Sequence, residues 1–149
     1  MGRFPGRRVL LYVLAQPAGA ALGSGLVQLI ATPGSSLGAT LPTHGAGQAL
    51  GVETFLTFGL VPMILRVTPG SKESGMLAGL AISATVALEA VVVGPLTGAS
   101  MNPTRSLAPA LLSGNWTDWW VCVMGPVAGA LLAVAVDKGL QGRGEAARA

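Results

Sequence analysis

Residues 94–118 read GPLTGASMNPTRSLAPALLSGNWTD, and this stretch decides the fold. It is too apolar for an ordinary solvated connection. Asn102 followed by Pro103 predicts a helix start, because asparagine caps free backbone N–H groups and proline suits the first helical position. Gly114 predicts a helix end. We therefore expect a helix over residues 103–113.

This helix would be too short to cross a bilayer. At about 1.5 Å per residue it would measure about 16 Å, roughly half of a hydrocarbon core. We interpret it as a re-entrant half-helix that enters the bilayer and returns. Non-helical backbone at that depth is tolerated only where protein buries it or where it lines a water-filled cavity. The sequence therefore predicts an internal cavity or conduit beside residues 103–113.

Arg105 lies in the first turn of the expected half-helix. A charge at mid-bilayer costs about 2.5–3.5 kcal/mol or more. One interpretation is an arginine that snorkels to the membrane surface from an ordinary loop. The alternative is an arginine beside a polar conduit. There it would act with the positive end of the helix to repel cations and protons, while offering hydrogen-bond donors to neutral solutes.

The composition indicates an integral membrane protein. Of 149 residues, 51% are hydrophobic and 10% are charged, and the mean hydropathy is +0.63. Soluble domains have about 25% charged residues, which this chain cannot supply. The expected fold class is an all-α membrane protein with about four transmembrane helices and one half-helix. The four apolar segments that we expect to span the bilayer are residues 9–31, 48–67, 76–93 and 119–136.

Other functional classes find little support in the sequence. A cleaved signal peptide would need a shorter apolar run than the first segment has, of about 7–15 residues. The basic residues are better interpreted as topology signals than as a nucleic-acid surface. We find no nucleophile–base pair, phosphate loop or metal-ligand spacing. The sequence therefore predicts no enzyme, no cofactor, no metal and no nucleic-acid partner.

The positions of the basic residues predict an orientation. The connection over residues 32–47 has no lysine or arginine, and the outer stretch has Arg105 alone. The positive-inside rule then places both termini in the cytoplasm of a multi-pass protein of the cell membrane. Trp116 and its neighbours would form an outer aromatic belt. The eight basic residues expected on the cytoplasmic side are Arg3, Arg7, Arg8, Arg66, Lys72, Lys138, Arg143 and Arg148.

Glycines four residues apart occur in all four segments. This spacing lets helix backbones approach closely in lipid, and we expect a tight bundle. The pairs are Gly19/Gly23, Gly47/Gly51, Gly75/Gly79 and Gly125/Gly129.

Several motifs together carry a resemblance to a known family. The run GASMNPTRS, which begins at Gly98, resembles the second NPA box of the major intrinsic proteins, the aquaporins and glyceroporins. The runs YVLAQPAG from Tyr12, GQALGVE from Gly47 and GPVAGA from Gly125 resemble three of the family's spans. The runs FPGRRV and GPLTGASMNP are most similar to plant nodulin-type members and their bacterial relatives.

The family is built from two inverted repeats of three spans and one half-helix each. Residues 1–149 resemble only the last span of the first repeat and the whole second repeat, and so predict a partial aquaporin-like domain. The resemblance implies a channel for water and small neutral solutes, embedded in the lipid bilayer and tetrameric at full length. The alternative is a non-conducting membrane protein with the second half of an aquaporin. We expect the chain alone to conduct poorly, because its half-helix has no partner.

The resemblance also implies roles for single residues. Asn102 would donate its side-chain amide to the passing solute, and Arg105 would form the selectivity filter together with Ala99 and Ala90. Glu53 would hold the backbone of the re-entrant loop. Pro103 and Thr104 complete the box, although the family usually has alanine in place of this threonine.

Alternative interpretations remain for several of these residues. Both alanines could be ordinary packing residues. Glu53 and Glu89 could be hydrogen-bonded carboxyls within the bundle, and Glu53 alone has a counterpart in the family. If Ala90 and Ala99 do lie at the filter, the opening should be wide enough for glycerol. Undissociated boric or arsenious acid and urea are alternatives of similar size.

Overall fold

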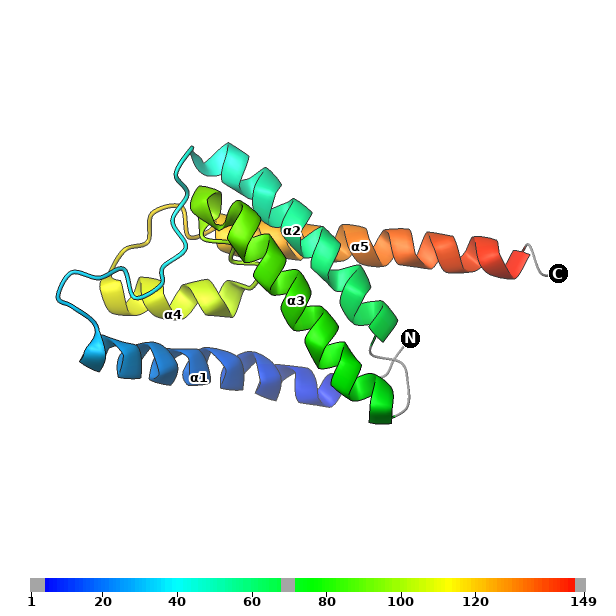
Figure 1. The fold of residues 1–149 in the computed structure, drawn as a ribbon, viewed down its shortest axis with the longest axis horizontal. Helices are drawn as coiled ribbons and strands as arrows, with labels where there is room; N and C mark the ends of the chain where they lie inside the picture. The colour runs from blue at the N-terminus through cyan, green and yellow to red at the C-terminus, as the bar shows by residue number, and fades with distance from the viewer. Residues whose placement is uncertain (1–4, 68–71, 147–149) are drawn as a thin grey trace.

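The computed structural model describes residues 5–67 and 72–146 (Figure 1). Within these ranges every regular element is a helix, which confirms the predicted all-helical class. The elements are a short 3₁₀ helix at Gly6–Arg8 and five α-helices: α1 (Val9–Ile30), α2 (Ala46–Val67), α3 (Lys72–Thr97), α4 (Pro103–Ser113) and α5 (Val121–Ala146).

Two helices are longer than their apolar segments. The helix α3 begins before residue 76 and continues past residue 93, and α5 continues ten residues beyond the apolar run that ends at Val136. Helical hydrogen bonding does not stop where hydrophobicity stops, and residues such as glutamine and lysine are good helix formers. The helix α5 also begins two residues later than predicted. The first backbone N–H to reach back four residues is that of Met124, which donates to the carbonyl of Trp120, and the N–H groups before it reach back only three. Apolarity therefore located these helices but not their ends.

Four helices are long and apolar enough to cross a membrane, judged by length and composition. Figure 1 shows that α4 begins part of the way along the bundle and ends at the same end as the connection between α1 and α2. This arrangement is the one that a half-helix requires. Its passage into a bilayer and back remains a prediction. The four long helical stretches are Gly6–Ile30, Ala46–Val67, Leu77–Thr97 and Val121–Gln141.

The helix α2 is the centre of the packing, since it packs against both α5 and α3, whereas α1 packs against α4 (Figure 1). A small apolar core lies where α2 meets the loop before α4. Its buried members are Leu56, Ala99 and Met101, and side chains of α3 such as Val86 and Val93 pack against them. The loop that carries the candidate site is thus seated on α2.

Among the four glycine pairs, one brings two helix backbones close together within the described residues. A Cβ atom on Gly125 would lie 2.6 Å from the Cβ of Glu53, and a Cβ atom on Gly129 would lie 2.3 Å from the carbonyl oxygen of Thr54. Within the described residues, the spacing of small residues therefore brings helix backbones together at this pair and not at the other three. Gly75 lies outside the residues whose surroundings are described. No atom lies within 4 Å of a Cβ atom built on Gly19, Gly23, Gly47, Gly51 or Gly79.

An ion pair joins α2 and α5 at the end away from the α1–α2 connection. Nη2 of Arg66 lies 3.1 Å from Oδ1 of Asp137, and Nε2 of Gln141 donates to Oδ2 at 2.6 Å. The aspartate is 5% exposed, while the arginine side chain is 63% exposed. Arg66, which the sequence marks as a topology signal, thus also satisfies a buried carboxylate.

Candidate functional site

The start of α4 has the capping geometry that the sequence predicts. Asn102 is extended, with φ −154° and ψ 116°, and its side-chain oxygen accepts a hydrogen bond from the N–H of Thr104 at 2.9 Å. Pro103 occupies the first helical position, where its missing N–H costs nothing. Gly114 ends the helix with a left-handed φ of 70°. The helix prediction for residues 103–113 is confirmed.

The loop before α4 has an unfavourable backbone conformation. Ala99 and Met101 have positive φ angles of 46° and 51°. Residues with side chains adopt this region at a cost of about 1–3 kcal/mol each. Gly98, with φ 81°, meets the backbone of Thr40, because a Cβ atom there would lie 2.9 Å from the Cα of that threonine. The loop therefore needs interactions from outside itself to keep its shape.

Glu53 on α2 supplies those interactions. Its Oε1 accepts hydrogen bonds from the N–H of Ser100 at 2.9 Å and from the hydroxyl of Thr97 at 2.7 Å. Its Oε2 accepts a hydrogen bond from the N–H of Met101 at 2.8 Å. The glutamate is completely buried. Hydrogen bonds to a buried carboxylate are strong, so this side chain offsets the strain of the loop and orients the start of α4.

Arg105 and Asn102 are exposed on the same side of α4, toward α1. Both line a groove of about 580 Å³ between the two helices. Nη1 of Arg105 donates a hydrogen bond to the carbonyl oxygen of Gly38, in the connection between α1 and α2, at 3.3 Å. The other polar residues of the groove are Gln16, Ser24 and Thr104, and Arg105 is the one charged residue among the described residues that line it. The structure therefore places two predicted site residues together in one groove, whose surface is mostly apolar and whose polar groups gather at a few side chains.

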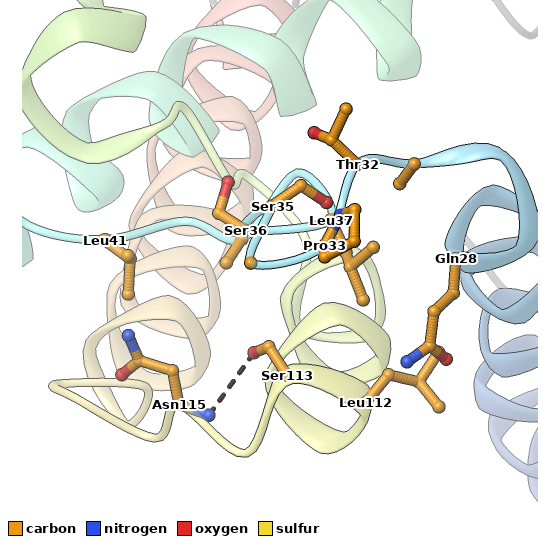
Figure 2. A pocket seen from close by; sticks show the side chains of 13 residues that line it. Gln28, Thr32, Pro33, Ser35, Ser36, Leu37, Leu41, Leu112, Ser113 and Asn115 are labelled. Atoms are coloured by element: carbon orange, nitrogen blue, oxygen red, sulfur yellow. Dashed lines mark hydrogen bonds between the residues drawn. The ribbon is translucent and has the colours of Figure 1, made fainter.

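A second hollow, of about 610 Å³, lies at the end of α1 and α4 (Figure 2). Gln28 comes from α1, Ser113 ends α4, and Asn115 follows it, donating its backbone N–H to Oγ of Ser113 at 3.3 Å. Thr32 and Ser36 line the same hollow from the connection. None of its lining residues, all within the described chain, is charged. This hollow thus offers neutral hydrogen-bonding groups.

The two predicted alanine positions differ in exposure. Ala90 is exposed on α3, whereas the side chain of Ala99 is 3% exposed and packs with Leu56 and Met101. Their role in a filter remains a prediction. Glu89, next to Ala90, approaches Gly59 of α2, and one of its carboxylate oxygens is buried without a hydrogen-bond partner among the described residues.

Sequence reasoning missed the hydroxyl groups that support the site. Thr97 and Ser100 lie within residues 94–118, at the end of α3 and in the glycine-containing loop that follows it. That position was a usable signal for backbone-holding side chains. Thr40 donates a hydrogen bond to Ser106 at 2.6 Å, although the two residues are 66 positions apart. No spacing in the sequence pointed to that pair.

The chain is similar to known proteins over most of its length. The chain is 47% identical over 131 residues to Aquaporin NIP1-1 of Zea mays, which covers 87% of this chain and 46% of the relative. It is 41% identical to the Probable aquaporin NIP-type of Nicotiana alata, over 87% of this chain and 48% of the relative. It is 43% identical to Probable aquaporin NIP4-2 of Arabidopsis thaliana, over 85% and 45% respectively.

The chain spans about half the length of these curated relatives. The resemblance to nodulin-type members that the sequence motifs suggested is confirmed. The relatives are named as channels of the aquaporin type and not as enzymes. Residues 1–136 match the family model described as "Major intrinsic protein". With its four long apolar helices, the chain is a multi-pass membrane protein, and it belongs to the major intrinsic protein family.

Proposed function

We propose that this chain forms part of the wall of a membrane channel for water and small neutral solutes such as glycerol. The observation that carries the proposal is the common position of Asn102 and Arg105. Both are exposed at the start of a half-length helix and supply hydrogen-bonding groups to one groove that is otherwise mostly apolar. The matched relatives, which are about twice as long, are named aquaporins.

The chemistry of the groove favours neutral solutes. The guanidinium of Arg105 and the amide of Asn102 are hydrogen-bond donors that can replace part of a solute's hydration shell. The positive charge of Arg105 and the positive end of α4 both oppose the entry of cations. The uncharged hollow drawn in Figure 2, which we take as the outer mouth, adds hydroxyl and amide groups without attracting ions.

The orientation is part of the proposal, and it predicts opposite labelling of two positions. Both are exposed: Ser36 lies in the α1–α2 connection, and Gln141 lies near the end of α5. In a Cys122→Ser background, an impermeant thiol reagent added outside cells should label Ser36→Cys and not Gln141→Cys. Both cysteines should react in permeabilised cells, which shows that each thiol is reactive once the reagent can reach it. If the external reagent labelled Gln141→Cys and not Ser36→Cys, the chain would have the opposite orientation in the membrane.

Flux measurements test the function itself. Liposomes that contain the purified chain alone should shrink under an osmotic gradient no faster than protein-free liposomes, because the groove of the chain is open on one side. Joined to the amino-terminal half of the maize relative, it should conduct water and glycerol. In that joined protein, Arg105→Val should admit cations while leaving neutral flux.

Each outcome discriminates between the candidates. A well-folded joined protein without flux would favour the non-conducting alternative. That alternative draws support from α1, which has no buried residue in the described chain. Flux through the chain alone, altered by Arg105→Val, would contradict the expected lack of conduction.

The width of the filter is tested at residue 90. Replacing Ala90 by histidine adds a ring and a donor at an exposed position of α3. In the joined protein, glycerol flux should fall at least about tenfold while water flux changes less, because selectivity follows pore diameter and lining donors. Stopped-flow light scattering measures both rates. Unchanged glycerol flux would place residue 90 outside the filter. Thr85→His, on the same helix, serves as the matched control variant.

A further inference from the structure

A row of buried hydroxyl groups runs beneath the first turn of α4. Thr40 donates to Oγ of Ser106 at 2.6 Å, and the Ser106 and Ser100 hydroxyls lie 2.5 Å apart. Ser100 in turn donates to the backbone carbonyl of Asn102 at 3.0 Å. All three hydroxyl residues are 5% exposed or less. We refer to Thr40, Ser106 and Ser100 as the hydroxyl chain.

The hydroxyl chain has a direction, because each hydroxyl group has one hydrogen to donate. The Thr40 hydrogen goes to Ser106, so the Ser106 hydrogen goes to Ser100, whose own hydrogen goes to Asn102. The sulfur of Cys122 lies 3.2 Å from Oγ1 of Thr40, and its thiol is then the donor to that hydroxyl. Every hydrogen is used once. Removal of any hydroxyl therefore leaves a buried polar group without its partner.

Thr40 is the one member of the hydroxyl chain that lies outside the α4 region. It belongs to the connection between α1 and α2, where its backbone lies closely against Gly98. Two residues before it, the carbonyl of Gly38 accepts the hydrogen bond from Arg105. Gly38 is itself exposed. The nearest buried anchor on this segment is therefore the side chain of Thr40.

We propose that Thr40 is a positioning residue for Arg105, acting through the hydroxyl chain. Its buried hydroxyl fixes the connection against Ser106, one residue beyond Arg105, and so holds the carbonyl of Gly38 against the guanidinium. This inference rests on the proposed function for its biological meaning, because the proposed function makes Arg105 the barrier to cations. It assigns part of the selectivity to a residue that does not line the groove.

Thr43 offers a matched control on the same connection. Its hydroxyl and its N–H both donate to the carbonyl of Leu96, at 3.0 and 3.1 Å. It thus also ties the connection to a neighbouring element, at the end of α3. It is exposed, and its hydroxyl bonds to the end of α3 and to His44 rather than to the hydroxyl chain. A general tethering effect would appear at both threonines, whereas positioning of Arg105 would appear at Thr40 alone.

A disulfide test checks the geometry in the full chain. In lipid nanodiscs, oxidation of Thr40→Cys with diamide should consume both thiols and join residue 40 to Cys122, whose sulfur lies 3.2 Å from the native hydroxyl. Thr43→Cys should not form this bond. Peptide mass spectrometry identifies the linked residues. Failure of Thr40→Cys to cross-link, in a chain that retains its helical circular dichroism, would overturn the placement of the connection.

The guanidinium signal of Arg105 tests the positioning role. The full chain is labelled with ¹⁵N-arginine in nanodiscs, and the Arg105 signal is the one lost in Arg105→Lys. Thr40→Val keeps the shape of the side chain but removes the hydroxyl. In this variant the Arg105 signal should merge with the signals of the arginines whose guanidinium protons exchange rapidly with water. Thr40→Ser should restore the signal, and Thr43→Val should leave it in place.

An unchanged signal in Thr40→Val, or an equal change in Thr43→Val, would overturn the proposal. Loss of the signal in Thr40→Ser would do so as well, because serine retains the hydroxyl. None of these readouts requires solute flux. A well-folded joined protein that does not conduct would therefore contradict the proposed function, while the positioning of Arg105 would still be decided by these signals.

Discussion

Replacement of Glu53 by alanine is expected to be among the most damaging single substitutions in this chain. It would remove the acceptor of three buried donors: the hydroxyl of Thr97 and the N–H groups of Ser100 and Met101. Each buried donor left without a partner costs about 1–3 kcal/mol. The positive φ of Met101 would then no longer be offset. The free energy of unfolding should fall by more than about 3 kcal/mol.

Equilibrium unfolding in mixed micelles by sodium dodecyl sulfate measures this loss. Glu89→Gln is the matched control, because Glu89 is also a carboxyl within the helical bundle, with one oxygen that lacks a partner among the described residues. Its effect should stay within about 1 kcal/mol. Equal effects of Glu53→Ala and Glu89→Gln would show that the loop before α4 does not depend on the carboxylate of Glu53.

The second large effect is expected at Gly129. A Cβ atom there would lie 2.3 Å from the carbonyl oxygen of Thr54 and 2.9 Å from the backbone nitrogen of Phe58. Both atoms belong to the backbone of α2, so no side chain can rotate away. Gly129→Ala must therefore push α5 away from α2. Glu53, which packs against Gly125 one helical turn away, would be displaced as well. Overpacking of this kind costs about 1–3 kcal/mol and sometimes more.

Gly139→Ala on the same helix provides the control, because no atom lies within 4 Å of a Cβ atom built there. Alanine is favoured over glycine in a helix by about 0.5–1 kcal/mol, so this variant should be neutral or slightly more stable. The same unfolding measurement applies to both. If Gly129→Ala were as stable as Gly139→Ala, the close approach of α2 and α5 would be wrong.

The local features of this protein could be predicted from its sequence. Apolar runs of about 20 residues locate membrane helices because the bilayer core demands that length. The ends of α4 were predictable because Asn102, Pro103 and Gly114 act on their own backbone neighbours. The position of Glu53, one charge within an apolar segment, together with its counterpart in the family, was enough to single it out as a site residue.

Tertiary structure decided what depends on distant partners. Four glycine pairs looked equivalent in the sequence, yet Gly125 and Gly129 alone approach another backbone among the described pairs, since the choice depends on which helix faces lie together. The hydrogen bonds from Thr40 to Ser106 and from Arg105 to Gly38 join residues more than 60 positions apart. Hydrophobic patterning specifies the helices and local capping ends them, whereas hydrogen bonds between distant side chains exist only once the helices have packed.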